Sequence, residues 1–510
     1  MATEVELKLS LDPVYLAQVA HQPVVTYYAE GCLRHRHLSN TYYDTPHQHL
    51  ATLGVALRLR YSEGCPTIQT VKTAGEGSGG LHRRGEWEWP VAGDSLDFAV
   101  IDAEPEVAEL FQDEGLRQAL QPLFTTDFQR TTWLLAFPDG TQVELAMDQG
   151  EVRTAGTSSP ISELELELIA GSPSRLYEVA RTLAEYLPLR LENISKAARG
   201  YALLTPTAPP ASRKAGILGL QQEATVEQAF CAIIQQGMEH LHANSPVVLH
   251  GTDPEGIHQM RVATRRLRSA LGLFRPLIPA LASAEMAEEL RWLTGELGPA
   301  RDWDVLLAET FVPLVTRFPD HQALHALRDR AEQGRVTAYR VAQAAVHSPR
   351  YTRLLLATGA WLGRRDWRDQ LDSKQLAALD QPIASFAATQ LTKRHRKVHR
   401  WGRRFEEMSA TERHQLRIYC KKLRYAAEFF SELYGETCRS YIRSVSLLQD
   451  ILGILNDGAV AKELLTQVQP DNNDPAVQLL LGWQGATAEW QLGQFTSAWD
   501  GFNSQSHFWE

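Results

Sequence analysis

The chain has 510 residues, of which 44% are apolar and 22% are charged, and its formal net charge is −10. This length suits two or more globular domains, and the composition excludes a wholly disordered protein. No run of about 18 apolar residues suits a membrane span, and the N-terminal residues lack the basic and apolar layout of a secretion signal.

The five cysteines are scattered and form no CxxC pair. This usage argues against a disulfide framework or a thiolate metal site, and it favours a reducing cytoplasm. The charge is uneven along the chain, because residues 1–205 hold 16 Lys and Arg against 28 Asp and Glu, whereas the remainder holds 35 against 33. If this acidic part of the chain binds a polyanion, it needs cations gathered at one place to offset its own negative charge.

The first 200 residues alternate apolar and polar residues over short runs that are separated by Gly, Pro and Asp turns. This pattern is typical of an antiparallel sheet or barrel, and helical stretches are expected around 105–121 and 173–186. Period two puts every second side chain on one strand face. Carboxylates therefore share one face at Glu4 and Glu6, and again at Glu163 and Glu165.

Basic residues follow the same period on strands between these two acidic stretches. They are Arg58 and Arg60 in ALRLR and Lys72 in TIQTVK. Carboxylates and cations that face one interior predict a site for a metal ion together with a polyanion. The glycine-rich run at 75–80 lacks the Lys-Ser/Thr and the helix of a P-loop, so we interpret it as a turn.

A Pro-rich stretch at 206–212 has the composition of a linker, and beyond it the pattern becomes helical and repeats. The segments that start at Ile257 and Arg413 align with an offset of 414 − 258 = 156 residues. A second pair of segments, from Leu293 and Leu448, aligns at nearly the same offset. We therefore expect domains at 1–204 and 216–510, a linker at 205–215, and a duplication of about 220–370 in 380–510.

Each copy of the repeated helix carries a basic stripe on one face and an apolar stripe on another. Like charges at this spacing repel, so a basic stripe is unfavourable unless it binds an anion. Arginine side chains match the geometry of phosphate oxygens. Two symmetric stripes therefore predict a groove for a polyanion, and the alternative is an ordinary solvated surface. No stacking platform for nucleic acid is visible. The stripes consist of His258, Arg261, Arg265 and Arg268 in the first copy, and His414, Arg417, Lys421 and Arg424 in the second.

These residues resemble two known families. The first 200 residues resemble a CYTH domain, the triphosphate tunnel fold, through EVELK at 4–8, ALRLR at 56–60, TVK at 70–72, VELAMDQG at 143–150, ELELEL at 163–168 and SKAARGY at 195–201. The half beyond the linker resembles a CHAD domain, a duplicated α-helical module. The order CYTH then CHAD is that of bacterial inorganic triphosphatases.

The resemblance implies an α+β multidomain protein, in which a closed antiparallel β-barrel forms a tunnel and an all-α duplicated bundle follows. It implies metal ligands at Glu4, Glu6, Asp148, Glu163 and Glu165. It assigns no firm role to Glu86, Glu88 or Glu167, and Arg83 could exchange roles with Arg84. The residues that it implies for gripping and catalysing cleavage of the phosphate chain are Lys8, Arg58, Arg60, Lys72, Arg130 and Lys196, with Arg84 as a further substrate contact.

The function expected from this resemblance is hydrolysis of inorganic triphosphate to diphosphate and phosphate. Oxygen-only ligands suit Mg²⁺ or Mn²⁺. The helical half is expected to bind polyphosphate, with no membrane or nucleic-acid partner. Two alternatives stay open: an organic triphosphate as substrate, as in thiamine triphosphatases or adenylyl cyclases, and a non-catalytic polyphosphate-binding protein.

Overall fold

The computed structural model describes residues 2–73, 75–78, 81–205, 209–251, 253–469, 471 and 473–510. These residues form two compact units, the first from Met1–Pro209 with Ser348–Arg364, and the second from Pro210–His347 with Arg365–Glu510. The boundaries expected from the sequence did not anticipate that residues 348–364 join the first unit. Residues 206–208 of the expected linker lie outside the described residues.

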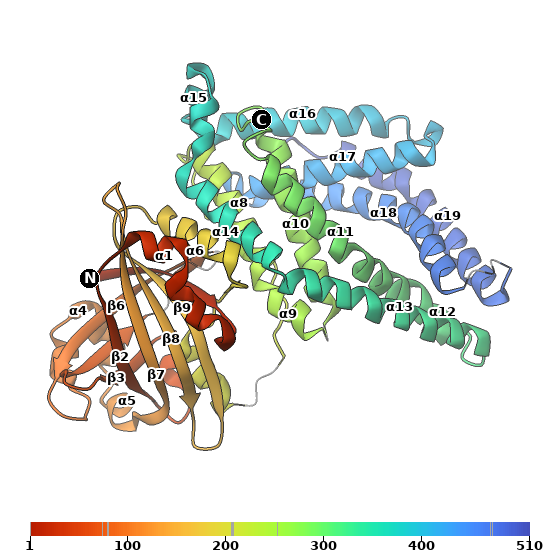
Figure 1. Cartoon of the computed structure of the whole chain (residues 1–510). Helices are drawn as coiled ribbons and strands as arrows, with labels where there is room; N and C mark the ends of the chain where they lie inside the picture. Colours follow the sequence, from red (N-terminus) through yellow and green to blue (C-terminus); the bar gives the residue numbers. More distant parts are fainter. Residues whose placement is uncertain are drawn as a thin grey trace. The chain divides into compact units, whose positions relative to one another are not determined.

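An antiparallel β-barrel forms the first unit (Figure 1). Its described strands are β1 (Ala2–Ser10), β2 (Ala29–Asp44), β3 (Ala56–Tyr61), β4 (Thr67–Lys72), β5 (Glu76–Ser78), β6 (Leu81–Val91), β7 (Gln121–Ala136), β8 (Gln142–Arg153), β9 (Ser158–Ala170) and β10 (Arg190–Leu191). The ring runs β1-β9-β8-β7-β2-β3-β4-β6 and closes where β6 pairs with β1. Closure removes the sheet edges and confirms the predicted antiparallel barrel.

The barrel carries its aliphatic side chains on the outside and its charges inside. Leu7 and Leu9 of β1 are fully buried, as are Leu164 and Leu166 of β9. They are covered because helix α6 (Ser174–Tyr186) packs on β1 and β9. Full burial of one such leucine stabilises the fold by about 1.5–3 kcal/mol. The interior faces of the same strands are thereby left for charged residues.

Several further helices belong to the first unit. The helices of the first unit besides α6 are α1 (Pro23–Tyr28), α2 (His49–Thr52), α3 (Phe98–Asp102), α4 (Pro105–Ala108), α5 (Glu114–Ala119), α7 (Lys196–Leu204) and α14 (Pro349–Arg364). The helical stretch expected at 105–121 is divided, because Asp113 caps the N-terminus of α5. Phe111 and Trp87 anchor the apolar cluster under these helices.

Helix α14 comes from the second half of the sequence but packs against α6. Its glycines allow the close approach, because a Cβ atom at Gly359 would lie 2.4 Å from the ring of Tyr177. A Cβ at Gly363 would likewise lie 2.5 Å from the Cβ of Ser174. Only glycine fits at such separations.

Helices form the second unit throughout. They are α8 (Val226–Ala243), α9 (Ser245–His250), α10 (Pro254–Phe274), α11 (Ala284–Leu306), α12 (Val312–Arg317), α13 (Gln322–His347), α15 (Ser373–Leu379), α16 (Ile383–Gly402), α17 (Ala410–Phe429), α18 (Cys438–Val468) and α19 (Pro475–Asn503). The two repeated segments lie in α10 and α17, as predicted. Thr225 and Pro382, which precede α8 and α16, form an antiparallel bridge, so equivalent positions of the two copies meet.

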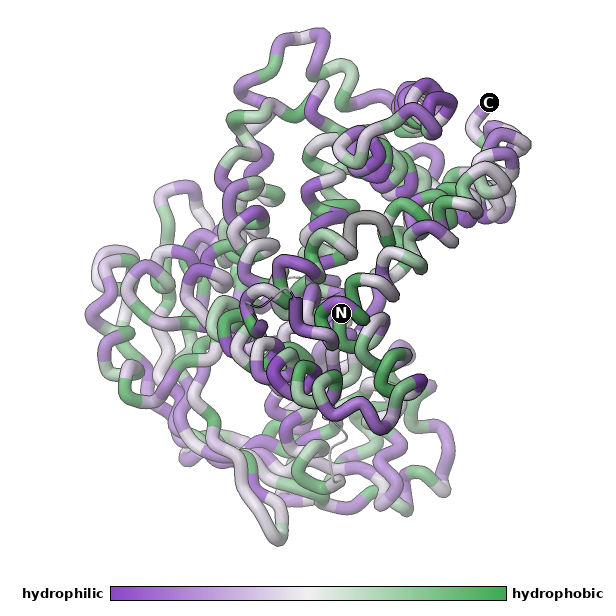
Figure 2. The backbone as a smooth tube through the Cα atoms, turned by 90° about the vertical axis from the view of Figure 1, so that its right-hand side faces the viewer, coloured by the Kyte–Doolittle hydropathy of each residue, from purple (hydrophilic) through white to green (hydrophobic). Residues whose placement is uncertain are grey.

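Several helices of the second unit, among them α10, α16 and α17, are amphipathic. Figure 2 shows hydrophilic and hydrophobic residues intermixed along the chain. In α17, for example, Leu416, Cys420 and Leu423 are fully buried at spacings of four and three residues. Such a stripe packs on neighbouring helices. Among the described residues, no helix combines the length and the apolar character that a membrane crossing requires.

Candidate functional site

The barrel encloses a cavity of about 560 Å³. Glu4, Glu6 and Lys8 enter it from β1 at period two, and Arg58 and Arg60 enter from β3 in the same way. The cavity is therefore polar because each strand turns one face inward. The other charged residues that line it are Arg34, Arg36, Lys72, Arg84, Glu86, Glu88, Arg130, Glu144, Glu165, Glu167 and Lys196.

Three cations on β3 and β4 hold carboxylates of β6. Arg58 lies 3.6 Å from Glu86, and Arg60 lies 3.2 Å from Glu88. Lys72 lies 2.9 Å from Glu86. Burial opposes the charge of Arg58, but Tyr42 and Glu86 outweigh it and raise the pKa of the guanidinium. Arg58 therefore stays charged, and the three cations form one basic wall.

The first acidic strand pairs with a second set of cations. Arg84 Nε donates to Glu4 at 2.9 Å, and Arg84 also binds Glu6. Lys8 lies 3.4 Å from Glu6 and 3.2 Å from Glu165. Burial favours the protonated form of Glu4, but Lys72 and Arg84 outweigh it and lower the pKa of its carboxyl to about 2.

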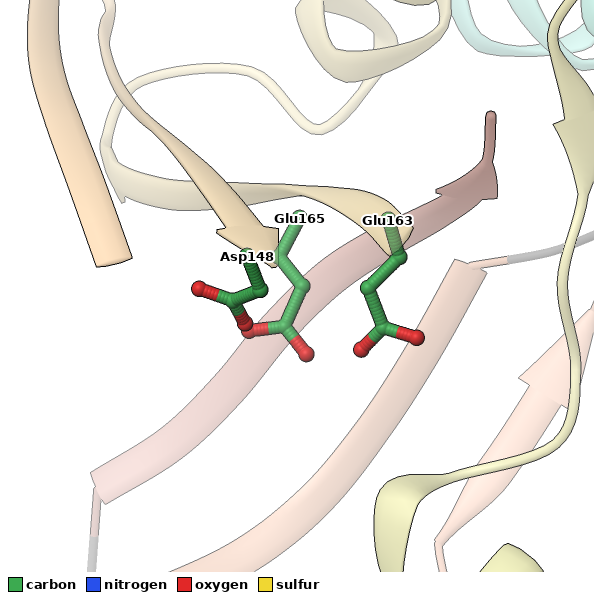
Figure 3. A group of neighbouring side chains, drawn as sticks. All are labelled: Asp148, Glu163 and Glu165. Carbon is green, nitrogen blue, oxygen red and sulfur yellow. The ribbon is translucent and has the colours of Figure 1, made fainter. Parts of the chain in front are cut away.

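Deeper in the barrel, three carboxylates converge on one point (Figure 3). One oxygen atom each of Asp148, Glu163 and Glu165 lies within 4.8 Å of the others. Lys196 inserts from α7 between them, with its Nζ 2.6 Å from Asp148 and 2.9 Å from Glu165. Arg130 binds Asp148 at 2.7 and 2.6 Å.

The charge of this cluster is balanced within the protein. Lys196 also binds Glu163, and Arg199 binds the second oxygen of Glu163. The cations Lys196 and Arg130 therefore outweigh burial and hold the pKa of Glu165 well below its ordinary value. Asp148 and Glu163 are fully buried behind the cavity wall. Three carboxylates meet four cations, because Lys8 also pairs with Glu165, so the cluster has no surplus negative charge.

A second set of carboxylates does carry surplus negative charge. Glu6 faces Glu167 in the β1–β9 register, and Glu167 faces Glu144 in the β8–β9 register. No ion pair to Glu167 or Glu144 is present among the described residues. Burial, Glu4 and Glu144 raise the pKa of Glu167 to about 7. Burial and Glu4 also raise the pKa of Glu86. Crowded carboxylates of this kind are typical of a cation site.

All the tunnel residues expected from the sequence lie in or against one cavity. The resemblance implied that Glu4, Glu6, Glu163 and Glu165 hold a metal, without a prediction of the strand register. The register places Glu167 opposite Glu6, Glu165 opposite Lys8, and Glu163 opposite Ser10. Arg84 enters the cavity, whereas the side chain of Arg83 lies outside the described ones.

Several site residues were not identified from the sequence. Arg34 and Arg36 of β2 line the cavity, and their period-two spacing is the same signal that identified Arg58 and Arg60. Arg199 lies three residues after Lys196 and so shares its helical face. Glu144 opposes Glu167 only through strand register, which no local pattern reveals.

The basic stripes of the second unit are divided among several environments. Arg261 lies 3.9 Å from Asp302 and donates to the carbonyl of Thr294 at 3.2 Å. Arg424 lies 3.6 Å from Glu428. Burial and Arg301 lower the pKa of His258 to about 4. Arg265, Arg268 and Lys421 line a cavity of about 570 Å³, whereas His414 and Arg417 are not among its lining residues.

Two family models match the chain. The model of the CYTH domain matches residues 2–201, and the model of the CHAD domain matches residues 232–466. A crystal structure of the CHAD domain from the plant Ricinus communis is 34% identical in sequence, with a TM-score of 0.51, and covers 58% of this chain and 98% of that chain.

Curated relatives extend the likeness. A protein named inorganic triphosphatase from Haemophilus influenzae is 35% identical over 209 residues, which are 40% of this chain. The match spans 55% of the length of that relative. An uncharacterised protein of Mycobacterium tuberculosis is 25% identical over 454 residues, covering 84% of this chain and 82% of that protein.

Proposed function

The chain belongs to the CYTH and CHAD domain families, and from that premise we propose that its first unit hydrolyses inorganic triphosphate to diphosphate and phosphate with a divalent metal ion. One observation carries the proposal. A single cavity inside the barrel holds a basic wall for a polyanion and, beside it, a surplus of carboxylates for a cation. The name of the Haemophilus influenzae relative supports the choice of substrate.

The cations of the wall bind the phosphate chain. Arg58, Arg60, Lys72 and Arg84 hold carboxylates in this structure, and phosphate oxygens compete for the same donors. Arginine forks bind such oxygens in bidentate fashion. Arg34 and Arg36, which have no ion pair among the described residues, add donors to the same cavity. Further donors are Lys8, Arg130 and Lys196.

The surplus carboxylates fit a hard divalent cation. Oxygen-only ligands and mutual repulsion favour Mg²⁺ or Mn²⁺. We assign the metal to Glu4, Glu6 and Glu167, with Glu165 beside them, because these carboxylates line the cavity, whereas Asp148 and Glu163 are fully buried behind its wall. When bound, the ion would polarise phosphate oxygens and make an attacking water more acidic.

The chain itself supplies position and charge rather than a nucleophile. Phosphoryl transfer needs neutralised phosphate oxygens and an in-line water. Among the described residues that line the cavity, no cysteine or serine is hydrogen-bonded to a general base that could make it a nucleophile. Arg58 and Lys72 would fix the orientation of the triphosphate, while the barrel wall limits the access of bulk water. The attacking water forms the new bond to phosphorus, and diphosphate leaves.

A substrate panel tests the proposal. Purified full-length protein is incubated with triphosphate, thiamine triphosphate, ATP and long-chain polyphosphate, with Mg²⁺ or Mn²⁺. Release of phosphate and formation of cyclic AMP are followed. Preferential release of phosphate from triphosphate, abolished in Glu4→Gln, is the expected result. If the protein prefers an organic triphosphate, that compound replaces inorganic triphosphate as the proposed substrate. If no compound is hydrolysed, the result favours a binding role.

For the second unit we propose polyphosphate binding. Arg265, Arg268 and Lys421 of the two stripes share one cavity with further cations of α16. A linear polyanion can contact many such cations at once, so its affinity should fall steeply with salt. Retention of polyphosphate by the full chain, compared with duplex DNA at the same salt concentration, measures this function. Equal retention of DNA would favour a nucleic-acid role.

A further inference from the structure

Two histidine side chains of the second unit meet nitrogen to nitrogen. Nε2 of His395, on α16, lies 3.1 Å from Nε2 of His507, which follows α19. A neutral imidazole carries one proton, so the two Nε2 atoms form a hydrogen bond only when one of them is protonated. The same separation suits two ligands of a single metal ion. Two Zn–N bonds of about 2.0–2.1 Å at the tetrahedral angle place their nitrogen atoms about 3.3 Å apart.

An oxygen atom holds the outer nitrogen of each ring. Nδ1 of His395 lies 2.8 Å from Tyr441 Oη, and Nδ1 of His507 lies 2.9 Å from a carboxylate oxygen of Glu510. Both oxygens can accept a hydrogen bond, so both rings can carry their proton on Nδ1. The two Nε2 lone pairs then repel each other unless a cation lies between them. Outer hydrogen bonds of this kind orient the histidines of metal sites.

The histidine pair lies among aromatic side chains. Phe502 and Trp509 are buried, and the ring centroid of Phe502 lies 5.3 Å from that of His395. Burial, together with His507 and His399, lowers the pKa of His395 to about 4. The ring of His395 is therefore neutral near pH 7, and neutral imidazole is the form that binds metal ions.

A third histidine adjoins the pair. His399 follows His395 by four residues on α16, and their ring centroids lie 6.0 Å apart. Histidines at this spacing share one helix face, as they do in helical zinc motifs. The basic residues of α16 point elsewhere, because they line a cavity that includes neither histidine. They are Lys393, Arg396, Lys397 and Arg400.

The pair joins two distant parts of the chain. The indole N–H of Trp509 donates to Thr392 of α16 at 2.9 Å, so the residues after α19 lie against this helix. His507 lies beyond residues 232–466, which the CHAD model matches. About a third of the His507 side chain is exposed, so an ion can enter from solvent.

We propose that His395 and His507 bind a divalent transition-metal ion such as Zn²⁺, and that this ion fastens the chain after α19 to α16. Imidazole nitrogens favour such ions, whereas Mg²⁺ and Ca²⁺ prefer oxygen ligands. The ion replaces the proton shared by the two Nε2 atoms. That proton moves to Nδ1 of His395, where Tyr441 accepts it, and water completes the coordination. The inference depends neither on triphosphate hydrolysis nor on polyphosphate binding.

Calorimetric titration of the full-length protein with Zn²⁺ tests the site. Mg²⁺ is kept in excess, because it competes for the carboxylates of the tunnel but not for imidazole nitrogens. We expect one zinc ion per chain whose X-ray absorption spectrum shows imidazole ligands. His507→Ala should lower the affinity by about tenfold or more. Zn²⁺ should also raise the melting temperature of the wild type more than that of this variant.

His325→Ala is the matched control. His321 and His325 have the same spacing of four residues at the start of α13, but their ring nitrogens contact the backbone. The N–H of Leu324 donates to Nδ1 of His321 at 3.1 Å, and Nε2 of His325 lies 2.7 Å from the carbonyl oxygen of Pro319. This variant should bind zinc as the wild type does.

Tyr441→Phe tests the positioning of the ligand. It removes the oxygen that holds Nδ1 of His395 but keeps the buried ring, so the zinc affinity should fall by about tenfold while imidazole ligands remain. Three results would overturn the site: unchanged zinc affinity in His507→Ala, an equal loss of affinity in His325→Ala, or an X-ray absorption spectrum without imidazole. Each of these results is independent of whether the protein hydrolyses triphosphate.

Discussion

Glu6 of β1 and Glu167 of β9 face each other across the antiparallel ladder, and both side chains reach the same cavity. Like charges in register are destabilising. Arg84 compensates Glu6, but Glu167 has no ion pair among the described residues. The repulsion is therefore concentrated at Glu167, where a bound divalent cation would relieve it.

Replacing Glu167 by Gln should make the protein require more metal. We expect the Mg²⁺ or Mn²⁺ concentration for half-maximal triphosphate hydrolysis to rise about tenfold or more. Without metal the variant should be more stable than wild type at pH 8 by about 1 kcal/mol, after discounting for solvent screening. Metal titrations of activity and thermal melts check the two parts. An unchanged metal requirement would remove Glu167 from the metal site.

The same residue gives a pH dependence of stability in the metal-free protein. Its folded pKa of about 7 lies above its ordinary value of 4.5, so the folded state binds more protons between these limits. Its contribution to stability is present below pH 4.5 and is lost as the pH rises through 7. Between pH 5 and 8, the melting temperature should fall less with rising pH in Glu167→Gln than in wild type.

Replacing Glu163 by Gln should mainly affect the fold. This fully buried carboxylate holds Lys196 and Arg199, and its loss leaves buried charge less compensated. We expect destabilisation by about 3 kcal/mol, with little change in the metal requirement. Glu151→Gln, which removes a surface pair with Arg153, is the control. A stable Glu163→Gln protein that needs far more metal would reverse the assignment.

Replacing Arg60 by Ala should weaken binding of triphosphate rather than of metal. Loss of one charge-assisted contact predicts an affinity about tenfold lower, measured by calorimetry in the presence of Ca²⁺ or without metal. Arg58→Lys should restore only part of the affinity of Arg58→Ala, because the bidentate fork is lost. The surface variant Arg153→Ala should bind as wild type does. Unchanged affinity in Arg60→Ala would exclude it from the site.

Removal of four stripe cations should abolish polyphosphate retention by the full chain and leave triphosphate hydrolysis largely intact. Filter binding over a range of salt concentrations measures the first property, and phosphate release measures the second. The four substitutions to Ala are at Arg261, Arg265, Arg417 and Lys421. A variant with four exposed surface arginines replaced, at Arg153, Arg340, Arg439 and Arg443, should retain polyphosphate. Equal loss in both variants would indicate a nonspecific charge effect.

Much of the barrel could be predicted from the sequence, because period two assigns each side chain to a face without reference to other strands. Arg58 and Arg60 were identified in this way, and Arg34 and Arg36 carry the same signal. The register between β1 and β9 could not be predicted, since it depends on pairing over more than 150 residues. For that reason no role was assigned to Glu167 from the sequence, although it occupies the position opposite Glu6.

The helical half shows a similar limit. Duplication of the basic stripe predicted two helices with equivalent faces, and the structure contains both helices, α10 and α17. The sequence could not show that Glu428 compensates Arg266, because this ion pair joins residues of the two different copies.

The packing of α14 on α6 has a consequence for the synthesis of the chain. Translation proceeds from the N-terminus, and domains usually fold as they emerge. Here the barrel residues emerge first, yet the helix that covers α6 ends only at Arg364. The nascent barrel must therefore wait, with the apolar face of α6 uncovered, until more than half of the chain has left the ribosome. A gene fragment that stops at the linker would encode a permanently unfinished first unit.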